Sequence, residues 1–163
     1  MIILEQNKFM DAVALHQNMV YRIALHHYGN SQDAEDTVQE VFLRLYVEDK
    51  PFDDLEHLRR WLIRVTINLC HDTLKSPWRK RRVSMDAIPE PVFEQPQQQE
   101  LYREVMSLPE KYRIVLNLFY YEELSTKEIA SLLGIRQSAV TTRLSRGREL
   151  LKQRLGDLWN DDE

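Results

Sequence analysis

Apolar residues recur every three or four positions through most of this 163-residue chain, which is the spacing of amphipathic α-helices. Three such helices are predicted in the first half, because Gly29 interrupts the first stripe and Pro51 interrupts the second. Ser31 is the expected N-cap of the second helix. The predicted inward faces are Phe9, Val13, Val20, Ile23 and His27, then Ala34, Val38, Val41, Phe42 and Leu45, then Leu58, Trp61, Leu62, Val65 and Leu69.

Four prolines and a run of glutamines mark residues 77–99, where the helical period is lost. Such a composition favours an extended, flexible linker. The apolar period returns near Glu100, and a further helix is expected to begin at 108–110, with Pro109 in its first turn. The chain is therefore predicted to be all-α, with a three- to four-helix domain at 1–76, a linker at 77–99 and a second helical domain at 100–163.

The clearest motif lies at residues 125–148, where a capped short helix, a glycine and a second helix follow one another. Ser125 and Glu128 have the spacing of a capping box, and Gly134 permits the tight turn that follows. Ala130 is small enough for the second helix to cross close above it. This pattern predicts a helix-turn-helix, and a plain helical hairpin is the alternative.

The second helix of this motif, predicted over 137–155, would place its first turns in the major groove of DNA. Side chains near that end are expected to touch base edges, and arginine is the side chain best suited to guanine O6 and N7. Arginines beside or beyond them are better placed for phosphates. The base-edge candidates are Ser138, Thr141, Thr142 and Arg143, and the phosphate candidates are Arg136, Arg146 and Arg148. For any single arginine, a solvated surface charge is the alternative.

The formal net charge of −4 argues weakly against a nucleic-acid partner, but the charges are unevenly distributed. Residues 31–56 hold nine acids and two bases, whereas residues 59–82 hold eight bases and one acid. Residues 125–155 hold seven bases and two acids. One acidic and two basic blocks indicate surfaces that face different partners, although ordinary solvated helix faces would give a similar pattern.

These motifs resemble two regions of the extracytoplasmic-function (ECF) sigma factors of bacterial RNA polymerase. The runs LPEKYR at 108–113 and RLSRGR at 143–148, with the helix-turn-helix between them, resemble region 4. The run DAEDTVQEVF at 33–42 resembles the core-binding motif of region 2, and WLIRVTIN at 61–68 matches the helix that follows. The resemblance covers nearly the whole chain in the family's order. Thr141, Thr142 and Gly147 depart from the family, and glycine inside a helix costs about 1 kcal/mol of helix stability.

The resemblance implies a protein that directs RNA polymerase to specific promoters and assists their opening. Region 4 would recognise the minus-thirty-five element through the helix-turn-helix residues named above and would meet the polymerase flap. Region 2 would bind the polymerase clamp helices and recognise the minus-ten element, with Phe52 stacking on a flipped base and Asn68 lining its pocket. The implied polymerase contacts are Asp33, Asp36, Gln39 and Glu40, and the implied minus-ten contacts are Lys50, Phe52, Arg60, Arg64, Asn68, His71 and Lys75. An anti-sigma factor is the implied regulatory partner.

The sequence supports no other chemistry. We assign no catalytic residue, metal ligand or cofactor, because the histidines and Cys70 lack the spacing of a ligand set. A single cysteine, no long apolar stretch and no signal-peptide pattern lead us to expect a cytoplasmic, non-enzymatic protein. Two other functions stay open: a conventional dimeric helix-turn-helix regulator of transcription, and a protein that only binds other proteins.

Overall fold

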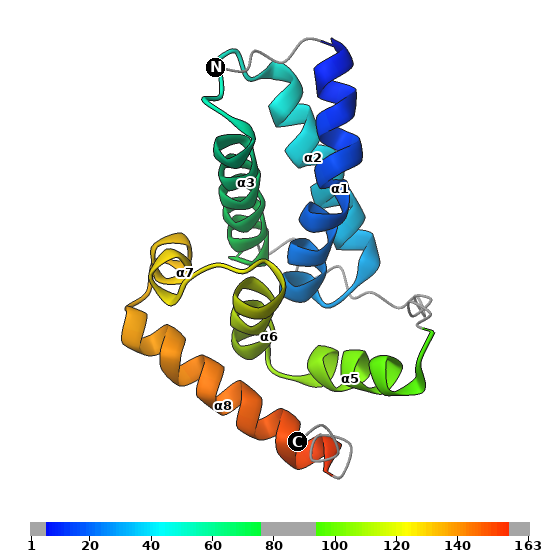
Figure 1. Ribbon diagram of the computed structural model, residues 1–163, viewed down its shortest axis with the longest axis vertical. Coiled ribbons are helices and arrows are strands. Elements are labelled where there is room, and N and C mark those ends of the chain that lie inside the picture. The colour runs from blue at the N-terminus through cyan, green and yellow to red at the C-terminus, as the bar shows by residue number, and fades with distance from the viewer. Residues whose placement is uncertain (1–5, 76–93, 157–163) are drawn as a thin grey trace. The chain divides into compact units, whose positions relative to one another are not determined.

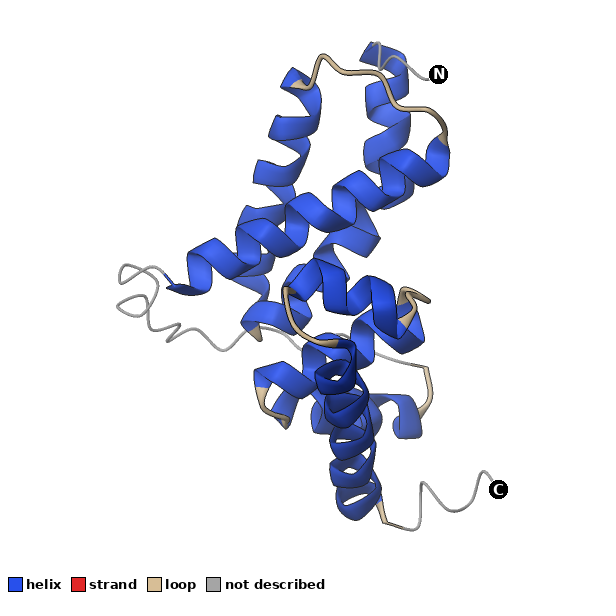
Figure 2. Cartoon of the chain, turned by 90° about the vertical axis from the view of Figure 1, so that its left-hand side faces the viewer, coloured by secondary structure: helices blue, strands red, loops and turns tan. Residues whose placement is uncertain are grey.

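The computed structural model describes residues 6–75 and 94–156. The chain divides into two compact units, Met1–Asp86 and Ala87–Glu163, each with its own hydrophobic core. The described parts of both units are helical, which confirms the predicted all-α class (Figure 2).

The first unit is a bundle of three helices, α1 (Gln6–Tyr28), α2 (Ser31–Val47) and α3 (Leu55–Lys75) (Figure 1). Each helix packs against the other two, and α1 makes the most extensive contact, with α2. The centre of the core is formed by large aliphatic side chains that are at most 1% exposed: Val20, Ile23, Val41, Leu45, Leu58, Leu62 and Ile63.

Two details of this unit correct the sequence prediction. The N-cap of α2 is Asn30 rather than Ser31: the Asn30 side chain accepts a hydrogen bond of 2.9 Å from the Asp33 backbone N–H, and Ser31 is already helical. The buried face of α3 is rotated, because Trp61, Val65 and Leu69 are only half-buried. The fully buried residues of α3 are instead Leu58, Leu62, Ile63, Thr66, Ile67 and Cys70.

The rotation of α3 has a physical reason. Apolar residues in this helix form two overlapping stripes, so periodicity alone does not select one. Thr66 can occupy the core because its hydroxyl donates a hydrogen bond of 2.6 Å to the Leu62 carbonyl, which satisfies its polar group. The same rotation still leaves Arg60, Arg64 and Asn68 exposed.

The second unit contains α5 (Pro96–Ser107), α6 (Glu110–Leu116), the π-helical turn η1 (Asn117–Tyr121), α7 (Thr126–Leu133) and α8 (Gln137–Leu155) (Figure 1). The long α8 packs against α5, α6 and α7. The core side chains with no exposure are Val115, Leu118, Ile129 and Val140.

Three features of this unit were not predicted. Helix α5 begins at Pro96, inside the stretch expected to be linker, with the proline in its first turn, where its missing N–H is harmless. Pro109 is the N-cap of α6 rather than a residue of its first turn. The turn η1 continues α6 with a wider helical geometry, in which the Glu122 N–H donates to the Asn117 carbonyl at 3.0 Å.

Candidate nucleic-acid interface

The helix-turn-helix forms as its sequence predicts. The Glu128 N–H donates to Ser125 Oγ at 3.1 Å, and the Ser125 N–H donates to Glu128 Oε1 at 3.2 Å, so both halves of the capping box are present. Gly134 ends α7 with φ of +68°, a conformation that favours glycine. The Ile135 N–H then donates to the Ala130 carbonyl at 3.1 Å. These bonds fix the angle at which α8 leaves the turn.

Gly147, one of the departures from the family pattern, lies where α8 crosses α6. The residue is buried, and a Cβ atom there would lie 3.1 Å from Leu116 Cδ1 and 3.4 Å from Tyr112 Cβ. Glycine therefore permits a close approach of the two helices. The other inward residues of α8 are those predicted, Val140, Leu144 and Leu151, together with Leu155.

The predicted DNA contacts of α8 lie on the faces turned away from this core. Five of them are exposed: Arg136, Ser138, Thr141, Thr142 and Arg146. Arg143 and Arg148 are half-buried on opposite flanks of the helix. The Arg148 guanidinium donates to the Tyr120 hydroxyl at 2.7 Å, so this side chain ties α8 to η1 in addition to any contact with DNA.

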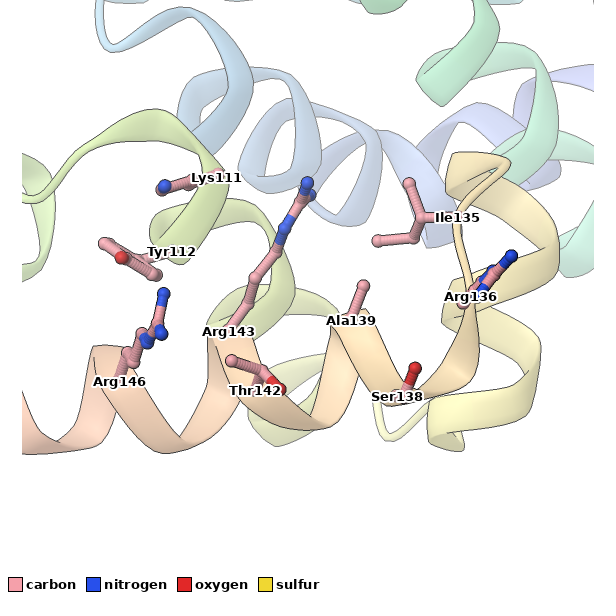
Figure 3. A pocket seen from close by; sticks show the side chains of 9 residues that line it. All are labelled: Lys111, Tyr112, Ile135, Arg136, Ser138, Ala139, Thr142, Arg143 and Arg146. Atoms are coloured by element: carbon pink, nitrogen blue, oxygen red, sulfur yellow. The ribbon is translucent and has the colours of Figure 1, made fainter.

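A surface pocket of about 460 Å³ lies between the first turn of α6 and the first half of α8 (Figure 3). Four basic side chains line it: Lys111, Arg136, Arg143 and Arg146. Ser138, Ala139 and Thr142 complete the α8 side of the pocket, and Ile135 lines it from the turn. Lys111 was missed by the sequence analysis, because it precedes the helix-turn-helix by more than a dozen residues and belongs to no charge pattern.

The acidic face of α2 has the predicted exposure. Asp36, Gln39 and Glu40 are exposed, and Asp33 is half-buried beside Asn30, whose Nδ2 donates to its carboxylate at 2.9 Å. Glu40 also pairs with Arg44 at 3.3 Å, but both side chains are about half exposed, so solvent screens the pair.

An apolar patch that the sequence analysis missed continues this face toward the C-terminal end of α2. Leu43, Tyr46 and Val47 are 61%, 66% and 75% exposed, although the periodicity of α2 is otherwise regular. The Tyr46 ring also meets Phe9 edge-on, with 5.3 Å between ring centroids. The face therefore combines acidic and apolar side chains, a composition that suits a protein partner.

The predicted minus-ten residues of α3 share one exposed face: Arg60, Arg64, Asn68 and His71. Lys50 is exposed in the preceding loop, and Lys75 is the last residue of α3, with its side chain outside the described residues. Glu56 partly neutralises the start of this face, because it pairs with Arg60 at 3.2 Å. The strongest cationic character therefore lies beyond the first turn of α3.

Phe52 does not lie where a stacking role requires. Its side chain is 3% exposed, and its ring meets His57 and Trp61 edge-on, at centroid distances of 5.2 and 5.6 Å. The loop around it is held by the Asp53 N–H, which donates to His57 Nδ1 at 2.9 Å. The expectation that Phe52 stacks on a flipped base is therefore wrong for this conformation, since a base cannot reach a ring that is almost fully buried.

Within residues 6–75 and 94–156, no group of three histidine, cysteine, aspartate or glutamate side chains is arranged to hold a metal ion. None of the described helices has the length and apolar character needed to cross a membrane.

Known protein families match both units. The Sigma-70 region 2 family matches residues 12–80, which include the acidic and cationic faces. The Sigma-70, region 4 family matches residues 98–151, which include the helix-turn-helix. A chain that carries these two regions in this order is a sigma factor, the subunit that gives bacterial RNA polymerase its promoter specificity.

Individual relatives identify the family within this class. The ECF RNA polymerase sigma factor SigW of Bacillus subtilis is 32% identical over 94% of this chain and 92% of its own length. The ECF RNA polymerase sigma-E factor of Escherichia coli K12 is 27% identical over 94% of this chain and 90% of its own length. The sigma factor RpoE of Bartonella quintana, solved in complex with the anti-sigma factor NepR, shares the fold, with a TM-score of 0.70 over 95% of this chain and 98% of that chain at 18% identity. The chain belongs to the ECF family of RNA polymerase sigma factors, as its motifs predicted.

Proposed function

We propose that this chain is an alternative sigma factor that directs RNA polymerase core to specific promoters, assists their opening and is held inactive by an anti-sigma factor. The observation that carries the proposal is the presence, in one chain, of an acidic and apolar face on α2, a cationic face on α3 and a helix-turn-helix. A transcription factor of this kind acts in the bacterial cytoplasm and catalyses no reaction of its own.

The face of α2 is the proposed docking surface for the clamp helices of the polymerase. Asp36, Gln39 and Glu40 supply the charge that steers encounter, and a basic partner surface would complement them. The adjoining Leu43 and Tyr46 supply apolar area that leaves water on binding. Charge sets the orientation and rate of docking, while apolar burial supplies affinity.

The exposed face of α3 is the proposed surface for the opened strand of the minus-ten element. Arg64 and His71 flank Asn68 on this face, at helical spacing along the same stripe. The Asn68 amide can both donate and accept hydrogen bonds, so it can recognise the edge of an unstacked base. Phe52 is not assigned to this surface, and the base would find its stacking partner elsewhere.

The first turns of α8 are the proposed readers of the minus-thirty-five element. Ser138 and Thr142 lie on the outermost face and carry hydroxyl groups that can donate or accept hydrogen bonds. Such small side chains let the helix approach the base edges closely. The boundaries 1–76, 77–99 and 100–163 remain our assignment for the two regions and the linker, so that the first turn of α5 forms the end of the linker.

Regulation by an anti-sigma factor is proposed from the relatives. The Bartonella quintana protein was solved with an anti-sigma factor bound, and a second neighbour, CnrH, was solved with the cytosolic domain of CnrY. A protein that covers the α2 face or the start of α8 would block polymerase or promoter binding by this chain.

The test is run-off transcription with the full chain and purified core polymerase on promoter libraries. Recovery of a common promoter sequence supports the proposal, whereas no stimulation with any bacterial core contradicts it.

The double variant Asp36→Arg with Glu40→Arg should abolish core binding, while duplex binding through the helix-turn-helix persists. Asp11→Arg is the matched control for Asp36→Arg, because Asp11 is exposed on α1 outside the proposed docking face. A conventional dimeric regulator would instead bind a palindromic duplex tightly without polymerase.

A further inference from the structure

The basic pocket beside α8 concentrates positive charge without neutralising it. Lys111, Arg136, Arg143 and Arg146 line one pocket (Figure 3). Among the residues that the structure describes, no carboxylate forms an ion pair with any of these four side chains. Like charges held together raise the local potential and favour an anion between them.

The pocket has the chemical character of a phosphate site. Three guanidinium groups and one ammonium group supply charged donors, and phosphate is the anion that arginine binds in bidentate fashion. Ser138 and Thr142 add hydroxyl groups at the lining. Arg143 is half-buried there, so its charge is screened less than that of a fully exposed side chain.

The position of the pocket relative to the recognition helix selects the source of the phosphate. Ala139, Arg143 and Arg146 form a stripe along one flank of α8, between the outermost face and the buried face that holds Val140 and Leu144. When the outermost face enters a major groove, this flank turns toward one wall of the groove. The wall of the groove is the phosphodiester backbone.

We propose, on the basis of the proposed function, that this pocket binds a backbone phosphate of the minus-thirty-five duplex, and that Lys111 contributes to the site from outside the helix-turn-helix. Lys111 reaches the pocket from the first turn of α6, and its Nζ lies 5.1 Å from the centroid of the Tyr112 ring. Arg143 is thereby assigned to the backbone rather than to a base edge. The contact fixes the depth and tilt of α8 in the groove, so Lys111 positions the helix and does not select bases.

The first experiment measures promoter binding by the full chain with core polymerase across a range of salt concentrations. Lys111→Ala should weaken binding about threefold to tenfold and reduce the slope of log K against log salt by about 0.9. The loss should be equal on duplexes with altered bases in the element. Lys8→Ala is the matched control, since Lys8 is exposed on α1 in the other unit. A slope equal to that of the control overturns the proposal.

The second experiment replaces single phosphates of the element with neutral methylphosphonates. A methylphosphonate at one or two adjacent positions should lower the affinity of the wild-type holoenzyme. The same replacement should not lower the affinity of the Lys111→Ala holoenzyme any further, because the contact with that phosphate is already lost. Lys111→Arg should restore the wild-type pattern. Additive losses at every position overturn the proposal.

A third arm separates backbone phosphate from a free anion. Binding of inorganic phosphate to the full chain is measured by NMR shifts of residues around the pocket, in the wild type and in Lys111→Ala. If phosphate binds only to the wild type, and no methylphosphonate position couples to Lys111, the pocket is a site for a free anion and the proposal is overturned. A wild-type chain that initiates on no promoter refutes the proposed function. A wild-type chain that initiates while Lys111→Ala matches Lys8→Ala refutes only the role of the pocket.

Discussion

The close crossing of α6 and α8 at Gly147 gives a quantitative prediction. Gly147→Ala gains about 1 kcal/mol of helix propensity. The new Cβ meets Leu116 Cδ1 at 3.1 Å, and the end of that flexible side chain must move to relieve the contact. The two effects nearly cancel, so we expect the alanine variant to lie within about 1 kcal/mol of the wild type.

Gly147→Val changes the balance. Its two γ-methyl groups cannot be accommodated by a shift of the Leu116 side chain alone, because Tyr112 Cβ, which is fixed to the backbone of α6, also lies only 3.4 Å from the Cβ position. Overpacking of this kind costs about 1–3 kcal/mol, and the gain in helix propensity from glycine to valine is a few tenths. The free energy of opening α8 should therefore fall by about 2 kcal/mol.

The assay is native-state hydrogen exchange of the α8 amides in the full chain, which reports on this unit separately from α1–α3. A loss of about 2 kcal/mol corresponds to a fall of roughly thirtyfold in amide protection. Ser145→Val is the control, because Ser145 is exposed on the same helix and takes the same β-branched side chain. Equal protection in the two valine variants would refute the packing argument.

Three further predictions concern both units. Asn68→Ala should impair promoter opening more than duplex binding. Opening is measured by permanganate reactivity and duplex binding by fluorescence anisotropy, and equal losses in the two assays would contradict a base-recognition role. Ser125→Ala should lower the stability of the helix-turn-helix by about 1 kcal/mol, measured as amide protection in α7, because it removes the capping box. Burial, assisted by the charge of Arg59, lowers the pKa of His16 below its ordinary value of 6.5, so the folded state resists protonation. The stability of the first unit should therefore be complete above about pH 6.5 and be lost progressively as pH falls below it. His16→Leu should flatten the pH dependence of the free energy of unfolding, measured by urea unfolding. An unchanged pH profile in this variant would refute the role of His16.

The helix-turn-helix was predictable residue by residue because several independent signals coincide there. The cap at Ser125, the glycine at 134 and the apolar period of the second helix all specify the same boundaries. Local chemistry and tertiary packing agree at this motif, so the sequence alone defines it. The acidic part of the exposed face of α2 was predictable for the same reason, although the apolar Leu43, Tyr46 and Val47 that continue it were missed.

The residues that escaped prediction depend on packing that periodicity does not encode. In α3, two overlapping apolar stripes left the buried face undetermined, and Thr66 is accommodated in the core because its hydroxyl donates a hydrogen bond to the Leu62 carbonyl. Phe52 was expected at a DNA surface because the family resemblance implied a base-stacking role for it, but its ring is buried against His57 and Trp61. Lys111 joins the basic pocket only because α6 folds beside α8.

The π-helical turn η1 bears on how the lengths of related chains can vary. One residue inserted into a regular α-helix would rotate all that follows by about 100° around the axis. A π-turn confines an extra residue to a local bulge, and here Leu118 and Leu124 still face the core on either side of Tyr121. A relative that lacks one residue in this turn could therefore form an uninterrupted α-helix and still aim its recognition helix in the same direction. Alignment gaps in this family should then concentrate at residues 117–121 rather than between α7 and α8.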